Sequence, residues 1–173
     1  MHETLLNKYA INHIGYYVKD LELACREHSA LFGSGPFFYL GEHTMTSIAR
    51  GREYEYTSRA AFGQFGDLQI EFIQVISDNP SAYKEMERFG LNHFSIWVDN
   101  VDSAIEEFEN AGYEIAMRLK SSGGAEIIYF DGVEKWGHYL EVSAPAEGMY
   151  EYFKKAAEDW DGSEPYRRLN MGK

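Results

Sequence analysis

The order of apolar and polar residues repeats itself along this chain. Residues 11–21 align with residues 91–101: Asn, His and one Val coincide, and apolar character is matched around them. Each copy opens with a run rich in β-branched and aromatic residues, which predicts a strand. Apolar residues at helical spacing follow and predict a helix that ends near Gly33 or Gly112. The apolar faces of these two helices would comprise Leu21, Ala24, Cys25, His28 and Leu31 in the first copy and Val101, Ala104, Ile105, Phe108 and Ala111 in the second.

A second matched pair follows at residues 68–72 and 138–142, where Glu71 coincides with Glu141. Between the two pairs, alternating segments are followed by Gly-rich or Asp-Gly turns, which indicate hairpins. The sequence therefore predicts an α+β fold of two βαβββ modules. Side by side they would form a curled mixed sheet of about eight strands with helices on its convex face.

The predicted organisation is a single domain spanning residues 1–173. Module one covers about residues 9–78 and module two about residues 91–145. A linker helix at about residues 79–90 joins them. A C-terminal helix with Met149, Tyr152 and Phe153 on one side and a tail occupy residues 146–173. From Asp161 onward the pattern fits an ordered arm and a frayed tail equally well.

Charge and composition limit the partners that we expect. The formal net charge is −12, from 28 acidic and 16 basic residues, which would repel nucleic acid and anionic membrane surfaces. No stretch reaches the roughly 18 apolar residues of a membrane span, and residues 1–4 do not resemble a signal peptide. We therefore expect a cytoplasmic protein that acts on a small molecule. Cys25 is the only cysteine, so no internal disulfide can form, and its helical position predicts a buried apolar role.

Strand alternation places four metal-competent side chains on the concave face. His13 would lie opposite the apolar positions of its strand, and the same parity applies to Glu71, His93 and Glu141. Two carboxylates inside a cup repel each other unless a cation intervenes. Two imidazoles and two carboxylates suit one divalent ion, Zn, Ni, Co, Mn or Fe, and leave about two octahedral positions for substrate oxygens. The alternative, hydrogen-bonded core histidines and rim glutamates, would require the same residue types to recur at the same phase by chance.

These motifs resemble the vicinal oxygen chelate (VOC) superfamily, which includes glyoxalase I, methylmalonyl-CoA epimerase, extradiol dioxygenases and the fosfomycin and bleomycin resistance proteins. The resemblance covers roughly residues 10–145 and rests on Asn-His in both opening strands, Leu-Gln-Ile-Glu at residues 68–71 and Tyr-Leu-Glu-Val at residues 139–142. It implies the fold above and one metal ion held by His13, Glu71, His93 and Glu141. We also expect a homodimer, and the sequence leaves open whether the halves, and with them the metal site, pair within one chain or across the dimer.

The resemblance does not select one reaction, because this fold hosts many. The His-Glu-His-Glu set is similar to glyoxalase I, but Tyr17 stands where compact bacterial glyoxalases carry Arg. Epimerases usually place Gln at the second ligand position, and the region of their catalytic Glu, near Arg59 and Ala60, has no carboxylate here, although Glu53 and Glu55 are close by. A fourth ligand and a short chain count against a dioxygenase.

The resulting hypothesis is a metal-dependent lyase or isomerase that transfers a proton beside a carbonyl, with Glu141 or Glu71 as the base. The rival hypotheses are a sequestering protein without chemistry and, with less support, a dioxygenase. We expect the substrate to be apolar or aromatic, because seven aromatic residues are placed on or near the cup: Tyr17, Phe37, Phe38, Tyr39, Trp97, Tyr129 and Trp136. Arg50, Arg52 and Arg59 are candidates to hold a substrate carboxylate; His28, His43 and His138 are given no function.

Overall fold

The computed structural model describes residues 8–169, so residues 1–4, considered above for targeting, and the end of the tail lie outside the described part. The first half of the chain has the order strand, helix and three strands. Its elements are β1 (Ile11–Tyr17), α2 (Leu21–Phe32), β2 (Phe37–Ala49), β3 (Arg52–Phe65) and β4 (Leu68–Val75).

A short helix, α3 (Ala82–Glu85), leads to the second half, which repeats that order with one additional helical turn. The elements are β5 (Gly90–Trp97), α4 (Val101–Asn110), β6 (Ile115–Lys120), β7 (Glu126–Phe130), α5 (Val133–Trp136) and β8 (Tyr139–Ser143). The chain continues with α6 (Glu147–Glu158) and β9 (Tyr166–Arg168). The α+β fold of two βαβββ modules is therefore confirmed.

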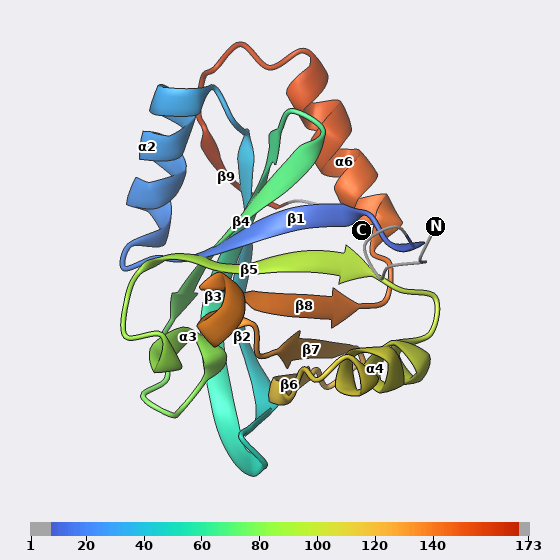
Figure 1. The fold of residues 1–173 in the computed structure, drawn as a ribbon. Helices are drawn as coiled ribbons and strands as arrows, with labels where there is room; N and C mark the ends of the chain where they lie inside the picture. Colours follow the sequence, from blue (N-terminus) through green and yellow to red (C-terminus); the bar gives the residue numbers. More distant parts are fainter. Residues whose placement is uncertain (1–7, 170–173) are drawn as a thin grey trace.

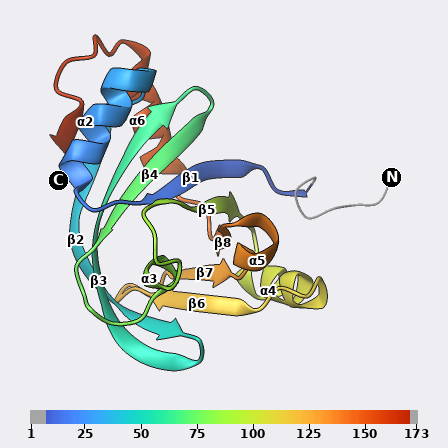
Figure 2. The ribbon, with the colours of Figure 1, turned by 60° about the vertical axis from the view of Figure 1, so that its left-hand side comes forward.

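The strands form one mixed sheet in the order β3-β4-β1-β5-β8-β7-β6-β2-β9, and β2 also pairs with β3, which closes the sheet into a barrel (Figures 1 and 2). The halves meet where β1 and β5 pair antiparallel, while β1 pairs in parallel with β4 and β5 with β8. The four strands expected to carry the site thus lie side by side. The C-terminal arm supplies a ninth strand, because β9 adds to β2 in parallel.

Local signals account for both long helices of the modules. The Asp20 side chain accepts from the Leu23 amide at the start of α2, Gly33 ends it in the left-handed conformation, and Asn100 caps α4 in the same way as Asp20. The prediction that Leu31 is buried was wrong, since it is 75% exposed. At about 100° per residue it lies some 120° around the helix from Cys25, which is at the centre of the buried side.

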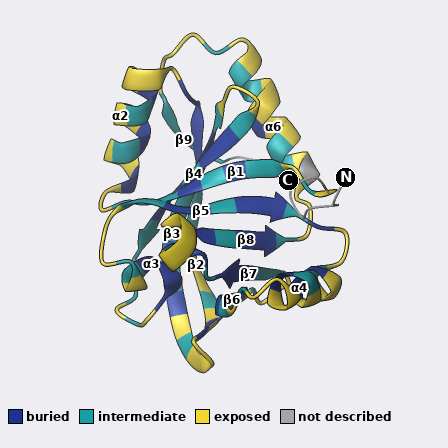
Figure 3. Ribbon diagram, in the orientation of Figure 1, coloured by how far each residue is buried: buried dark blue, intermediate teal, exposed yellow. Residues whose placement is uncertain are grey.

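Helices cover both faces of the strongly curved part of the sheet. α2 packs with Phe37 and Ala61, whereas α6 packs with Phe38 and Phe62, the alternate residues of the same strands. Figure 3 shows dark, buried strands between helices whose outer sides are exposed. α6 therefore fills part of the concave side, one end of the space that the two modules enclose.

Two connecting segments differ from the sequence-based expectation. The linker helix is limited to Ala82–Glu85, because Glu87 has a left-handed backbone (φ 51°) that a helix cannot contain. The segment after α6 is an ordered arm as far as residue 169, where the Leu169 amide donates to the Tyr39 carbonyl. In residues 8–169 no helix has the length and apolar character needed to cross a membrane.

Candidate metal centre

The four candidate ligands converge on one point inside the barrel. His13 projects from β1, Glu71 from β4, His93 from β5 and Glu141 from β8, and one ligand atom of each lies within 4.8 Å of the others. The two Nε2 atoms are 3.2 Å apart, the Nε2 of His13 is 3.4 Å from an oxygen of Glu71, and the Nε2 of His93 is 3.2 Å from an oxygen of Glu141. Strand parity thus placed these side chains correctly.

Gly15 makes room for this arrangement. It is paired with Glu71 on one side and with His93 on the other. A Cβ atom at this position would lie 2.0 Å from Cε1 of His93, far inside van der Waals contact. The imidazole can therefore occupy its position only because residue 15 has no side chain.

Hydrogen bonds orient the imidazoles with their Nε2 atoms inward. Nδ1 of His93 is 3.0 Å from Oδ1 of Asn92, and an amide oxygen only accepts, so Nδ1 carries the proton. Nδ1 of His13 bonds to the hydroxyl of Tyr150, which itself donates to Oδ1 of Asn12 at 3.4 Å. Outer partners of this kind are typical of histidines that bind metals.

Positive charge is required to stabilise the two buried carboxylates of this centre. His13, His93 and Glu141 are at most 4% exposed, and their inward lone pairs repel one another. Burial disfavours the charge of Glu71, but hydrogen bonds from His13 and His93, when both imidazoles are protonated, outweigh this and lower its pKa to about 2. Burial likewise opposes a charge on His13, yet the carboxylates of Glu141 and Glu71 raise its pKa. Protons on the imidazoles or a bound cation can supply this charge, and the mixed nitrogen and oxygen donors fit a divalent transition metal.

The two carboxylates are not equivalent. Ser95 donates from Oγ to Glu141 at 2.8 Å, which fixes one carboxylate oxygen. In the described residues Glu71 has no such hydroxyl partner: the two imidazole Nε2 atoms lie 3.4 Å from one of its oxygens, and its side chain is 12% exposed, against 5% for Glu141. Glu71 is therefore the carboxylate with more freedom and better access from the cavity.

A cavity of about 500 Å³ opens onto the centre. His13, Glu71 and Glu141 form its polar floor, and the remaining lining is mainly apolar and aromatic. The lining includes neither Lys nor Arg from the described part of the chain, and Glu126 adds a third carboxylate. Such a wall favours an uncharged, apolar ligand over a polyanion.

Of the seven aromatic residues expected in the cup, Trp97 and Tyr129 line the cavity. Phe37 and Phe38 cannot face the same side, because neighbours on a strand alternate; Phe37 packs under α2 and Phe38 stacks on Phe153 of α6.

The other three aromatic residues also lie outside the cavity lining. Tyr39 packs with Tyr166 of β9, and Tyr17 with Tyr83 and Phe89. Trp136 is 61% exposed on α5.

The arginines and the remaining histidines do not reach the cavity floor. Arg50 pairs with Glu85 and Asp131, and Arg59 pairs with Glu42, so neither is free to hold a substrate carboxylate there. Arg52 is likewise no part of the cavity lining.

The histidines given no function have structural contacts. His28 bonds to Ser34, and His138 packs on Phe94. His43, in the outer wall of the cavity, bonds to the carbonyl of Leu40.

Three tyrosines of the cavity were missed by the sequence interpretation. Tyr150 contacts His13 from α6, outside both modules, and Tyr56 and Tyr83 line the wall. The Asn that precedes each His could have indicated the outer partners of the imidazoles. No sequence pattern indicated the three tyrosines, because they are far from the ligands in the sequence.

The closed sheet of two βαβββ halves, with one His and one Glu from each half at its centre, defines the vicinal oxygen chelate class. The chain belongs to the Glyoxalase/Bleomycin resistance protein/Dioxygenase superfamily, whose family model matches residues 12–130. That match includes His13, Glu71 and His93 and ends before Glu141.

Solved structures with the same fold include methylmalonyl-CoA epimerase from Mycobacterium tuberculosis, at 16% identity and a TM-score of 0.54 over 82% of this chain and 91% of that one. A hypothetical protein from Bacillus halodurans is 17% identical, with a TM-score of 0.56 over 80% of this chain and 96% of that one. A variant of Streptomyces coelicolor methylmalonyl-CoA epimerase in complex with 2-nitronate-propionyl-CoA is 18% identical, with a TM-score of 0.54 over 79% of this chain and 94% of that one. A search of curated proteins finds no match. These similarities establish the fold and leave the reaction open.

Proposed function

We propose that this protein is a divalent-metal-dependent enzyme that transfers a proton at the carbon beside a carbonyl, as a lyase or isomerase, on a small apolar or aromatic compound. The observation that carries the proposal is the convergence of His13, Glu71, His93 and Glu141 at the floor of an apolar cavity. A divalent ion held by these four residues would polarise the carbonyl and acidify the adjacent C–H bond.

Glu71 is our candidate for the general base. It faces the cavity and lacks the serine hydrogen bond that holds Glu141. Glu71 would detach from the metal when substrate binds and then accept the proton as a carboxylate. Glu141, bonded to Ser95, would serve as a fixed ligand, and the surrounding aromatic wall would exclude water from the reacting carbon.

The matched variants Glu71→Gln and Glu141→Gln test this assignment. The probe is α-hydroxyacetophenone in D₂O, with exchange of its CH₂ protons followed by NMR, and the metal content of each variant is measured in parallel. We expect Glu71→Gln to keep the metal and lose exchange by about 100-fold or more. Exchange at the wild-type rate in metal-loaded Glu71→Gln would refute the role of Glu71.

The composition of the cavity lining also bears on the substrate. One epimerase structure with this fold contains methylmalonyl-CoA. In this chain the cavity lining, as described, offers no cationic side chain to bind the phosphates of a CoA thioester. Two of its three carboxylates would bind the metal, and the third, Glu126, pairs with Arg118 and Lys120. We therefore propose a substrate without phosphate groups. The homodimer and the cytoplasmic location remain predictions, to be checked by light scattering after gel filtration and by fractionation of cells that express the protein.

A second candidate function is sequestration of an apolar ligand without chemistry, which the apolar wall and the covering helix α6 would also support. The two functions differ in their need for metal. A purified protein that binds the probe with unchanged affinity after chelation, and that catalyses no exchange, would favour sequestration.

A further inference from the structure

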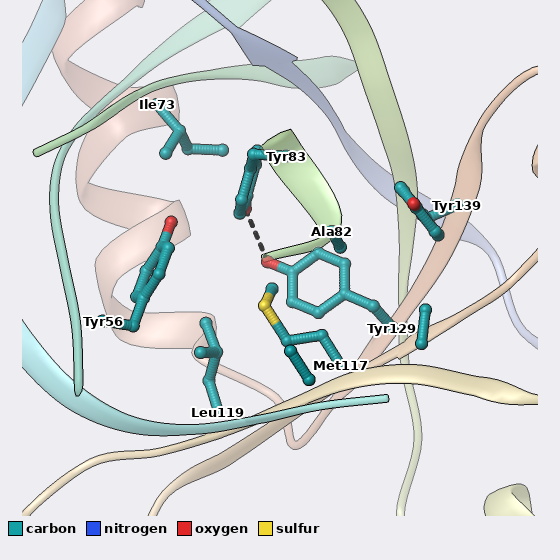
Figure 4. Packing of buried hydrophobic residues seen from close by; sticks show 10 residues of the cluster. Tyr56, Ile73, Ala82, Tyr83, Met117, Leu119, Tyr129 and Tyr139 are labelled. Atoms are coloured by element: carbon teal, nitrogen blue, oxygen red, sulfur yellow. Dashed lines mark hydrogen bonds between the residues drawn. The ribbon is translucent and has the colours of Figure 1, made fainter. Parts of the chain in front are cut away.

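Three tyrosines from different elements meet inside the cavity beside the metal centre. Tyr56 comes from β3, Tyr83 from α3 and Tyr129 from β7, and each is 2% exposed (Figure 4). The hydroxyls of Tyr83 and Tyr129 are 2.7 Å apart, and the ring of Tyr56 stacks on that of Tyr83 at 6.0 Å and 19°.

This group lies next to the ligand His93. The ring centroids of Tyr129 and His93 are 5.2 Å apart, and those of Tyr83 and His93 are 6.2 Å apart, both in edge-to-face contact. All three tyrosines also line the cavity that opens onto Glu71 and Glu141. A ligand bound at the centre would therefore be within reach of their hydroxyls.

The hydroxyls of Tyr83 and Tyr129 have one proton that their mutual hydrogen bond does not use. The ring of Tyr56 stacks beside this pair and lines the same cavity. The pair has two hydroxyl protons and one hydrogen bond between its members, so one proton is left for a further acceptor. A buried hydroxyl without a partner is costly, and the cavity is where a partner can enter.

The hydroxyls stay protonated and uncharged. The usual pKa of a tyrosine hydroxyl, about 10, keeps both groups neutral at neutral pH. Neutral phenols donate to neutral oxygens, and the lining described for this cavity contains no cation that would select an anion.

We propose that Tyr56, Tyr83 and Tyr129 form a second oxygen subsite, which binds a hydroxyl or carbonyl group of an uncharged aromatic or alicyclic substrate while another carbonyl of that substrate faces the four ligands. The inference rests on the proposed function and adds the substrate class, an apolar frame with two oxygen groups. A cavity of about 500 Å³ is within the size range of pockets for such molecules.

Binding of four probes to the metal-loaded protein tests the subsite by calorimetry: acetophenone, 3′-hydroxyacetophenone, 4′-hydroxyacetophenone and 4-acetylbenzoate. One net hydrogen bond predicts that at least one hydroxylated probe binds about 3- to 10-fold more tightly than acetophenone. Tyr129→Phe and Tyr83→Phe should remove this preference and leave the affinity for acetophenone unchanged. The charged benzoate should bind more weakly than acetophenone.

Tyr152→Phe is the matched control, because Tyr152 of α6 packs on Phe38, is 37% exposed and is no part of the cavity lining. It should keep the wild-type preference. The subsite is refuted if neither hydroxylated probe binds better than acetophenone, or if both tyrosine variants keep the preference. Metal content separates the two proposals: tyrosine variants that retain both metal and preference overturn the subsite alone, whereas a protein that binds no metal overturns the proposed function.

Discussion

Gly15→Ala adds one methyl group at the contact on which the centre depends. In the wild-type backbone this carbon would lie 2.0, 2.2 and 2.6 Å from three ring atoms of His93. Ordinary carbon contacts are about 3.5–4.0 Å, so the imidazole must move by about 1.5 Å. Metal ligands tolerate deviations of about 0.2 Å, so His93 would no longer coordinate. We expect a loss of metal affinity of at least about 100-fold, measured by competition with a chromogenic chelator.

Gly63→Ala is the matched control for this prediction. Its new carbon would meet the ring of Phe37 at 2.5 Å, a similar overlap in the apolar layer under α2. Overpacking of this kind costs about 1–3 kcal/mol, so both variants should unfold several degrees below the wild type. Metal affinity should fall in Gly15→Ala and stay at the wild-type value in Gly63→Ala. Equal affinities in the two variants would contradict the position assigned to His93.

Three further predictions concern residues around the site and in the core. Tyr150→Phe removes the hydroxyl that orients His13 and should weaken metal binding by about 10- to 100-fold. It should also change the visible spectrum of the cobalt-loaded protein. An unchanged spectrum together with an unchanged affinity would count against this role of Tyr150. Ser47→Ala should leave the melting temperature unchanged or raise it, because the buried Ser47 hydroxyl has no partner in the described structure; a clear drop would reveal a missing contact. Burial raises the pKa of the Cys25 thiol, so a disulfide reagent should label it upon unfolding, and rapid labelling of the native protein would contradict its position on the buried side of α2.

The face of the sheet on which a residue lies could be predicted from the sequence where it follows from the two-residue alternation along one strand. The repeat gave the two modules, and alternation placed His13 and Glu71 on the concave face, with Ile70 and Phe72 toward α2. Where alternation was not applied, as for Phe37 and Phe38, the prediction failed.

Contacts between distant segments were beyond the reach of these patterns. Tyr150 meets His13 because α6 turns back into the barrel, and no periodicity within residues 147–158 specifies that path. Tyr83 enters the cavity from a helix of four residues, where a helical face has no meaning. The pairing of β2 with β6 likewise joins strands of different modules and leaves no local mark in the sequence.

The central claim is that two imidazoles and two carboxylates hold one cation inside the barrel. Anomalous diffraction at the absorption edge of the metal found in the purified protein tests it most directly. We predict one peak per chain, at about 2.0–2.2 Å from a ligand atom of each of His13, Glu71, His93 and Glu141. A peak elsewhere, or crystals soaked in Zn²⁺, Ni²⁺ or Co²⁺ without a peak among these four residues, would contradict the account.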